Sequence, residues 1–468
     1  MESIKEICNK FWEVENRHNL LSKQICEVKF WEVIRYELLN EILRNKGIYG
    51  EAHTKKKTIW SNFVLLSSIV YNSIFFNPLF GIYTKDILVF EHPRKVRKNG
   101  RYIDIYTNHL LNENDEIQFL EPDSRKRNTK SKEKGVNKKT LDLFYPFAIT
   151  KMKQKKIFLD EKELNLLKNI EHDLKKEFNV EVNLYDKVKK AIRKFKIQYD
   201  FYQKILRKRK PKEIYLVVGY LQPALIHAAK SIGIKVIELQ HGVINKYHLG
   251  YNFPNQQQKV DYFADKLLIF GEFWKKGIRY PIPSEDIKVI GFPFFNMQVE
   301  KYRNITKKPK QIIFISQGTV GHALSKFAYH SALELKDYTF IYKLHPGEYD
   351  RWKREYIELV KASQLKNFNV VDSNDKDLHY YLSESEFQVG VYSTALYEGF
   401  SLKCKTILFQ YTGVEYLEEI VKEGFAKVVT NISELKQVLV NNKAVENEYD
   451  IFFKKTKQRL LRNNENTE

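Results

Sequence analysis

Four short polar sequences in the second half of this chain contain the residue types that acid–base chemistry and anion binding require. They are Gln240-His241-Gly242, Ser316-Gln317-Gly318, Lys343-Leu344-His345-Pro346 and Tyr392-Ser393-Thr394, the last of which precedes Glu398. Each directly follows a short apolar run that is typical of a buried parallel strand. Because ligands of open α/β sheets bind at the carboxyl ends of the strands, we expect these residues to converge on one site.

Three of these sequences have features of a phosphate-binding site. Ser393 and Thr394 lie at the predicted start of a helix, where hydroxyl groups and free backbone N–H groups can bind an anion. His345 can donate a hydrogen bond to a phosphate oxygen, Lys343 can add positive charge, and Gly318 would let the backbone approach closely. Each residue also has an ordinary structural explanation, such as a helix N-cap for Ser393. Their common position after successive strands is what favours phosphate binding.

His241 is the first candidate for a general base, because an imidazole titrates near neutral pH. Glu91, His92 and Asp104 are the alternatives, since they also lie near the ends of predicted strands. We assign no Asp-x-Asp sequence to a metal–diphosphate site. The expected chemistry therefore uses no metal ion and no cofactor, and positive side chains and N–H groups stabilise the phosphate instead.

The elements that would position these residues form two sets of short apolar strands separated by helical segments. The first set is predicted at 87–90, 214–218, 235–239, 267–270 and 287–290, and the second at 311–315, 338–342, 368–371, 386–390, 406–410 and 426–429. Two successive βα sets predict two Rossmann-like, doubly wound parallel sheets. The expected units are a helical extension at 1–84, an N-terminal domain at 85–300, a C-terminal domain at 301–445, and a C-terminal helix and tail at 446–468. That helix, at about 446–462, is expected to pack back towards the N-terminal domain.

The composition predicts attraction to polyanions. The chain has 79 Lys and Arg residues against 58 Asp and Glu, a formal net charge of +21. Basic runs at 122–140 and 187–212 would allow nucleic-acid binding, but neither shows a recognition motif. The first run is typical of a solvated loop, and the second keeps an apolar helical stripe. Three distant cysteines and no apparent signal peptide indicate a reducing compartment, the cytosol.

Residues 58–84 form an uncharged and largely apolar stretch directly after Lys55-Lys56-Lys57. Our first interpretation is a helical hairpin buried in the protein. An interfacial membrane anchor is the second, and a membrane span is the third. Asn72, Asn77, Pro78 and Gly81 weigh against the span because they interrupt the apolar run.

Five segments between about 213 and 440 allow a comparison with known enzymes. They are IELQHGVIN, KLLIFGEFW, IKVIGFPFFN, FIYKLHPGE and VGVYSTALYEGFSLKCKTILF. They resemble the metal-independent GT-B enzymes of bacterial capsule, lipopolysaccharide and teichoic-acid synthesis, which include sialyltransferases, Kdo transferases and CDP-glycerol glycerophosphotransferases. The resemblance implies that His345, Ser393 and Thr394 bind the donor phosphate and that His241 is a candidate base. IGFPFFN resembles the interdomain Gly-x-Pro-x-x-(Asp/Asn) signature, which places the domain linker just after Pro293.

The same C-terminal segments also resemble UDP-GlcNAc 2-epimerases and retaining GT-B transferases. Those retaining enzymes use two glutamates eight positions apart. In this chain the positions eight residues before and after Glu398 are Gly390 and Thr406. Their identities argue against the retaining mechanism and favour inversion.

The sequence therefore predicts an inverting, metal-independent glycosyltransferase that moves a sugar from a nucleotide-activated donor to a surface polysaccharide or lipid-linked glycan. The acceptor would lie mainly against the N-terminal domain, and the donor mainly against the C-terminal domain. Residues expected to complete the donor site are Ser316, Gln317, Gly318, Lys343 and Glu398. The alternatives are a CDP-glycerol-type glycerophosphotransferase, a UDP-GlcNAc 2-epimerase-like enzyme and a nucleic-acid-binding protein. The expected location is cytoplasmic, with peripheral association with the inner face of the cell membrane as an option.

Overall fold

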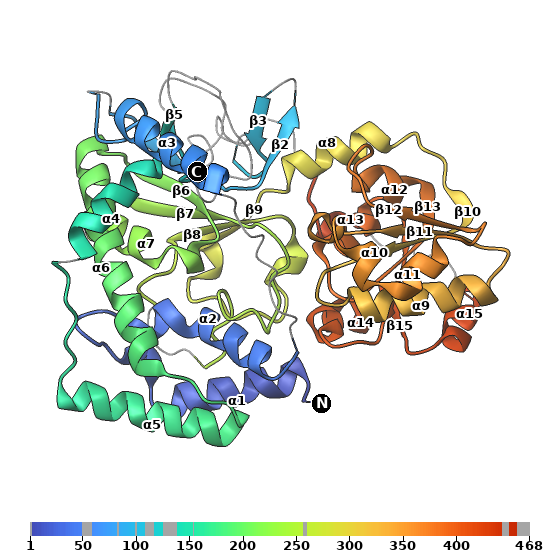
Figure 1. Cartoon of the computed structure of the whole chain (residues 1–468), viewed down its shortest axis with the longest axis horizontal. Coiled ribbons are helices and arrows are strands. Elements are labelled where there is room, and N and C mark those ends of the chain that lie inside the picture. The colour runs from blue at the N-terminus through green and yellow to red at the C-terminus, as the bar shows by residue number, and fades with distance from the viewer. Residues whose placement is uncertain are drawn as a thin grey trace.

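Two parallel β-sheets covered by helices lie side by side in the protein (Figure 1). The structure is a computed structural model that describes residues 2–48, 59–81, 84–98, 101–107, 117–124, 138–152, 154–255, 260–441 and 449–455. The chain leaves the first sheet at residue 289 and enters the second at residue 308. Helix α8 (Pro293–Tyr302) lies between them.

The first sheet has seven strands in the order β5-β4-β1-β6-β7-β8-β9, and all neighbouring strands are parallel. They are β1 (Ile87–Phe90), β4 (Ile117–Glu121), β5 (Lys138–Thr140), β6 (Glu213–Val217), β7 (Lys235–Leu239), β8 (Lys266–Ile269) and β9 (Ile287–Val289). An antiparallel hairpin follows β1 and consists of β2 (Lys95–Lys98) and β3 (Arg101–Asp104). The winding direction of the sheet reverses between β1 and β6.

The second sheet has six parallel strands in the order β12-β11-β10-β13-β14-β15. They are β10 (Lys308–Ile315), β11 (Thr339–Lys343), β12 (Phe368–Val371), β13 (Ser385–Gly390), β14 (Lys405–Phe409) and β15 (Ala426–Val429). Here the winding direction reverses between β10 and β13. The predicted pair of doubly wound parallel sheets, with helices at the N-terminal end, is thus confirmed.

The strands that the sequence did not predict are β2 to β5. The basic stretch 122–140 was expected to be a loop, and this is wrong for its last three residues, which form the edge strand β5. An edge strand needs only backbone pairing on one side, and lysines are common there because they discourage pairing with other chains. Residues 125–137 of that stretch lie outside the described residues.

The helices surround both sheets. They are α1 (Ile4–Arg17), α2 (Phe30–Asn45), α3 (Ile59–Phe75), α4 (Phe144–Met152), α5 (Glu161–Phe178), α6 (Leu184–Arg209), α7 (Pro223–Lys230), α9 (Gly321–Glu334), α10 (Trp352–Glu355), α11 (Ile357–Ala362), α12 (Leu378–Glu384), α13 (Thr394–Ser401), α14 (Glu418–Lys422) and α15 (Ile432–Asn441). Helices α1, α2, α5 and α6 share one apolar core with Leu249 and Tyr262 of the first sheet's loops. The predicted stripe of the basic helix is confirmed, since Ile192 and Phe195 of α6 are buried in that core.

A buried ion pair fixes α1 and α2 to the first domain. Arg35 on α2 donates to both carboxylate oxygens of Glu15 on α1, at 2.9 and 3.2 Å, and to the backbone oxygen of Leu249, at 2.6 Å. Both charged side chains are almost fully buried. The first helices therefore determine the position of the loop around residue 249.

The interpretation of residues 58–84 as a buried hairpin is wrong. Residues Ile59–Phe75 form one helix, α3, and near its end Asn72 faces the protein and donates to Asp142 at 2.8 Å; Asn77, just after the helix, is buried. Large apolar side chains point to solvent instead, and Trp60 and Phe63 are 73% and 63% exposed. Among the described residues, no helix is long and apolar enough to cross a membrane.

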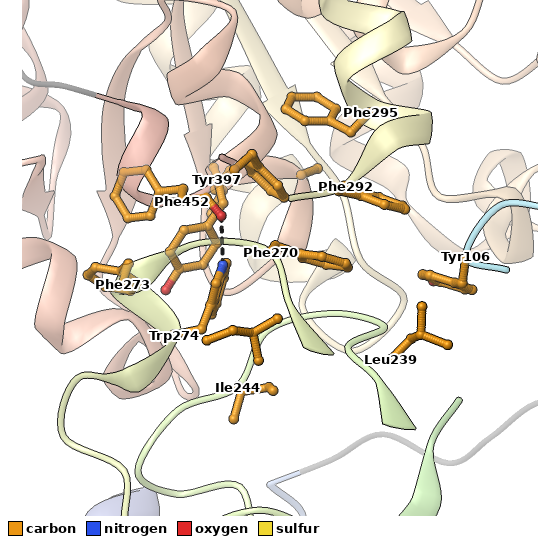
Figure 2. Close-up of a cluster of buried hydrophobic side chains, with 14 of the residues drawn as sticks. Tyr106, Leu239, Ile244, Phe270, Phe273, Trp274, Phe292, Phe295, Tyr397 and Phe452 are labelled. Atoms are coloured by element: carbon orange, nitrogen blue, oxygen red, sulfur yellow. Dashed lines mark hydrogen bonds between the residues drawn. The ribbon is translucent and has the colours of Figure 1, made fainter. Parts of the chain in front are cut away.

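Aromatic side chains join the two domains. The ring centroids of Trp274 and of Tyr397 of the second domain are 4.7 Å apart, and Phe270 stacks on Phe292, directly before α8, with centroids 4.4 Å apart. Figure 2 shows these rings together with Phe452 from the C-terminal segment, whose backbone oxygen accepts a hydrogen bond from the Trp274 indole at 2.8 Å. The segment 449–455 thus packs on the first domain. Most of the helix predicted at about 446–462 lies outside the described residues.

Candidate functional site

Loops from both sheets meet where the strands end. The loops that follow β1 and β6, and those that follow β10 and β13, leave their sheets at the two points where the winding reverses, which is where α/β sheets bind ligands. The loop after β7 reaches the second domain: a Cβ atom on Gly242 would lie 3.4 Å from the Thr394 hydroxyl oxygen. The ends of β7 and β13 therefore face one another at the boundary between the domains, and the region around them is called the interdomain cleft below.

Arg94 is a cation within this cleft that the sequence analysis did not select. It follows β1, is exposed, and its guanidinium donates weakly to the Tyr106 hydroxyl at 3.4 Å. Burial is the main reason that the pKa of both His241 and His345 is lowered, and the Arg94 guanidinium lowers each further. It also lowers the pKa of Glu398. Arg94 therefore lies close to candidate residues from both domains. Its position directly after β1, the strand at which the winding reverses, could have identified it from the sequence.

His345 is held in a defined orientation and, when neutral, in a defined tautomer. It lies exposed directly before the short 3-10 helix Pro346–Glu348, and its Nδ1 accepts a hydrogen bond from the backbone N–H of Gly347 at 3.2 Å. Because Nδ1 is the acceptor, a neutral His345 carries its proton on Nε2. The exposed ring can therefore donate a hydrogen bond to an oxyanion.

Glu348 is a buried carboxylate that organises the loops after β10 and β11. Its oxygens accept from the backbone N–H of His345 at 2.8 Å, from the Ser316 hydroxyl at 3.0 Å and from the Tyr356 hydroxyl at 2.7 Å. The side chain has no solvent exposure. Ser316 is buried and its hydroxyl is occupied by this network, so its role here is to hold the loop.

Helix α13 begins at the cleft. Ser393 is its N-cap, and the Ser393 hydroxyl accepts from the backbone N–H of Ala395 at 3.3 Å. Gln317 fixes the preceding loop, since its amide group donates to the backbone oxygen of Tyr392 at 2.7 Å and accepts from that residue's N–H at 3.3 Å. Thr394 faces Gly242, so the helix N-terminus, with its positive end of the peptide dipole, opens towards the first domain.

Gly318 allows Arg351 to lie close to the backbone, because a Cβ atom at Gly318 would be 2.9 Å from the Arg351 guanidinium. Lys343 is bound by other residues of the second domain. Its ammonium donates to the Tyr349 hydroxyl at 2.6 Å and to the backbone oxygen of Ser373 at 2.7 Å, and burial lowers its pKa to about 8. Lys343 is therefore engaged in the second domain.

Glu398 forms a hydrogen-bonded pair with His379, with the two side chains 3.1 Å apart. Burial acts to raise the pKa of Glu398, but His379 and then Arg94 outweigh it, and the pKa is lowered. A carboxylate that stays ionised beside Arg94 can orient that guanidinium across the cleft.

His241 lies half-buried on the opposite side. Its backbone oxygen accepts a hydrogen bond from Tyr106 at 2.9 Å, and its Nδ1 is buried with no hydrogen-bond partner. Burial, then Arg94, lower its pKa to about 4. The ring is neutral at neutral pH, and no hydrogen bond occupies its Nδ1.

The three alternative bases differ in the hydrogen bonds and ion pairs that their side chains already make. Asp104 is fully buried and accepts from the backbone N–H groups of His92 and Tyr106, and burial raises its pKa to about 6. Glu91 is buried in an ion pair with Lys95 at 2.7 Å. His92 lies near His241, with ring centroids 6.5 Å apart. His92 is therefore the alternative whose geometry competes with His241.

No three His, Cys, Asp or Glu side chains within the described ranges gather in a way that could hold a metal ion. The sequence does contain Asp375-Lys376-Asp377 after β12. Asp377 caps α12 and accepts from the Tyr302 hydroxyl at 2.7 Å, and Asp375 pairs with Ser373 at 2.7 Å. These carboxylates serve local structure.

No protein-family model matches the chain, and no curated protein matches it. Among solved structures it is similar to a UDP-GlcNAc 2-epimerase from Neisseria meningitidis bound to UDP-GlcNAc, with 14% identity, 77% of this chain and 92% of that chain covered, and a TM-score of 0.44. MurG from Acinetobacter baumannii is 14% identical, the similarity covers 53% of this chain and 69% of MurG, and the TM-score is 0.38. A glycosyltransferase from Rickettsia africae is 19% identical, the similarity covers 59% of this chain and 76% of that enzyme, and the TM-score is 0.35. These are similarities of fold.

Proposed function

We propose that this protein is an inverting, metal-independent glycosyltransferase that uses a nucleotide-activated sugar donor. One observation supports this above the others: Arg94 of the first domain lies close enough to lower the pKa of His345 and of Glu398 on α13, both in the second domain. A guanidinium, an imidazole N–H and a helix N-terminus together form a binding site for a phosphorylated ligand. A diphosphate bound there would contact residues of both domains.

In the proposed reaction an acceptor hydroxyl attacks the anomeric carbon of the donor, and His241 takes the hydroxyl proton. The bond between the anomeric carbon and the phosphate oxygen breaks, and the electron pair stays on the nucleotide phosphate. Arg94, His345 and the N–H groups of α13 stabilise this developing charge. An anionic donor beside His241 would raise its pKa from the low ligand-free value, because a nearby negative charge favours the protonated form.

Two related reactions would use the same anion site. A glycerophosphotransferase would attack phosphorus rather than the anomeric carbon, and an epimerase would act on the nucleotide sugar alone. An epimerase needs no acceptor, and a glycerophosphotransferase releases CMP from CDP-glycerol. Analysis of the products from a panel of nucleotide sugars and CDP-glycerol therefore separates the three.

The anion site itself is tested by thermal shift with UDP, CDP and CMP, because a ligand that prefers the native state stabilises it. We expect one of these nucleotides to raise the melting temperature of the wild type and of Arg207→Ala, an exposed arginine on α6. Arg94→Ala should lose most of that increase. Equal stabilisation of both variants would exclude the proposed anion site.

We also propose that the enzyme acts at the inner face of the cell membrane on a lipid-linked or surface glycan. The exposed apolar face of α3 supports this, since Trp60, Phe63, Leu66, Val70 and Ile74 recur at helical spacing and point away from the protein. A net charge of +21 adds attraction to anionic headgroups. Such a helix is expected to lie in the interface, with its apolar face among the acyl chains.

Flotation with vesicles of phosphatidylglycerol and phosphatidylethanolamine tests this contact. Trp60→Ser with Phe63→Ser should weaken binding at least about tenfold, because two aromatic side chains no longer enter the bilayer. Val440→Ser is the matched control, since Val440 is 81% exposed on α15 of the second domain. Unchanged binding of the double variant would exclude α3 as the contact.

A further inference from the structure

A cavity of about 170 Å³ lies between the two domains, beside the site described above. Helix α2 contributes Tyr36 and Asn40, and the loop after β7 contributes His248. Tyr392 and Tyr416 form the wall from the second domain. The cavity therefore exists only when both domains and the first helices are in place.

The cavity is separate from the anion site but adjoins it. In the second sheet β13 lies between β10 and β14. His345 follows β11 on one side of β13, whereas Tyr416 follows β14 on the other. Tyr392, directly before the N-cap of α13, borders both regions. A ligand in the cavity would thus lie next to a bound donor rather than in its place.

The cavity also adjoins the candidate base. Tyr220 connects the two, with its ring 5.0 Å from His248 and 6.2 Å from His241. His241 is also close enough to lower the pKa of His248, a second effect after burial. The cavity and the candidate base are therefore neighbours, separated by the Tyr220 ring.

The cavity walls have the chemistry that binds carbohydrate. Tyrosine and histidine rings offer flat apolar faces, and Tyr36 stacks on His248 with centroids 5.3 Å apart and 18° between planes. His248 Nδ1 accepts from the backbone N–H of Gly250 at 3.1 Å, which leaves the proton of the neutral ring on Nε2. The side-chain amide of Asn40 makes no hydrogen bond within the described part of the chain. It can offer both a donor and an acceptor to hydroxyl groups.

The size of the cavity fits one sugar ring. A cavity of roughly 150 Å³ in another protein admits benzene, a flat six-membered ring. The cavity here is slightly larger, and unlike that example it has polar groups in its walls.

We propose that this cavity is the acceptor subsite and that it binds one pyranose ring of the acceptor glycan, with the attacking hydroxyl directed towards His241. The identity of this ligand rests on the proposed transferase function. Helix α2 and the loop after β7 thereby select the acceptor, and the second domain completes the subsite through Tyr392 and Tyr416.

Methyl glycosides test the subsite in the full chain. Saturation-transfer NMR would be recorded with the methyl pyranosides of glucose, galactose and N-acetylglucosamine, and with uridine as the nucleoside probe. We expect at least one methyl pyranoside to bind the wild type. Asn40→Leu should weaken it about tenfold, because the ligand loses hydrogen bonds that Asn40 made. Tyr36→Leu should also weaken it by removing a stacking surface.

Asn45→Leu is the matched control, because Asn45 lies exposed on the same helix. It should bind the methyl pyranoside as the wild type does. Nucleotide-induced thermal stabilisation should be the same in Asn40→Leu, Asn45→Leu and the wild type, which also shows that the variants fold.

Three results would overturn the proposal. One is that no methyl pyranoside binds a wild type that nucleotides do stabilise, which leaves the transferase function intact. Another is that Asn40→Leu abolishes binding of uridine, which would make the cavity a nucleobase site. The third is that Asn40→Leu raises the KM for the donor and leaves the KM for the acceptor unchanged, which would make it a donor-sugar site. Absence of nucleotide stabilisation in the wild type would count against the transferase function instead.

Discussion

At the scale of single residues, His241 and His92 compete for one role. Both rings are neutral at neutral pH, since burial lowers the pKa of each to about 4. His241 has a buried nitrogen without a partner, whereas Nδ1 of His92 accepts from the backbone N–H of Arg94 at 3.1 Å. We therefore predict that His241→Ala lowers kcat by about 10²–10⁴ and leaves nucleotide affinity nearly unchanged.

His92→Ala should have the smaller effect on kcat. The measurement is steady-state turnover together with nucleotide binding by calorimetry for both variants. Normal turnover in His241→Ala, with loss of turnover in His92→Ala, would give the role of base to His92.

Glu348 is a positioning residue rather than a contact to the ligand. Burial lowers the pKa of His345, and the Glu348 carboxylate opposes this effect. We predict that Glu348→Gln lowers the pKa of His345 further, because the opposing charge is removed. The variant should also lose about 1–3 kcal/mol of stability, since an amide N–H₂ replaces one of the two oxygens that accept hydrogen bonds.

Titration of His345 by NMR measures the first effect, and Ser316→Ala is the control. That substitution removes a hydrogen bond to Glu348 but leaves its charge in place. A His345 titration that is the same in Glu348→Gln, Ser316→Ala and the wild type would show that Glu348 has only a structural role.

At the scale of elements, the buried pair of Glu15 and Arg35 connects the first two helices to the loop that forms the acceptor cavity. Removing one partner of a buried ion pair leaves an uncompensated charge, which costs about 3–5 kcal/mol. Glu15→Ala should therefore lower the urea midpoint of unfolding strongly, whereas Glu13→Ala, exposed on the same helix, should not. Equal midpoints for the two variants would contradict this account of the pair.

Strands such as β7 and β13 could be predicted because each is a short apolar run that ends in a polar turn, whereas β4 and β5 of the first sheet were not predicted. Helix α3 shows where such reasoning fails. Its sequence is apolar on nearly all sides, which is typical of a buried helix, but Asn72 faces inward and donates to Asp142, whereas Trp60 and Phe63 are exposed. Which side of a helix is covered depends on its neighbours, and periodicity contains no information about them.

At the scale of the whole molecule, the candidate site depends on strand pairing over long sequence distances. Arg94 became significant because β1 pairs with β6, more than a hundred residues later in the chain, at the point where the winding reverses. Conversely, Lys343 follows the predicted pattern but is held by Tyr349 and Ser373. Order along the chain identified the strand ends that form the cleft, and tertiary contacts decided which side chains are available in it.

The histidines of the cleft give the whole molecule a predictable response to acid. Burial lowers the pKa of His92 and of His241 to about 4, from an ordinary value near 6.5. Between these values the unfolded chain binds protons that the folded chain does not, so each histidine's contribution to stability is lost as the pH falls from about 6.5 towards 4. Asp104 and Glu238 act in the opposite direction, because burial raises their pKa to about 6 and about 7.

Comparison of the wild type with a variant that lacks the two histidines separates their effect on stability from that of the carboxyl groups, because the carboxyl groups are present in both proteins. In His92→Gln with His241→Gln, neither replaced position can take up a proton. We therefore predict that the melting temperature of the wild type falls more than that of the double variant when the pH is lowered from 7.5 to 5. Scanning calorimetry at the two pH values measures the difference. Parallel changes in the two proteins would mean that these histidines are already protonated, or freely hydrated, in the folded state.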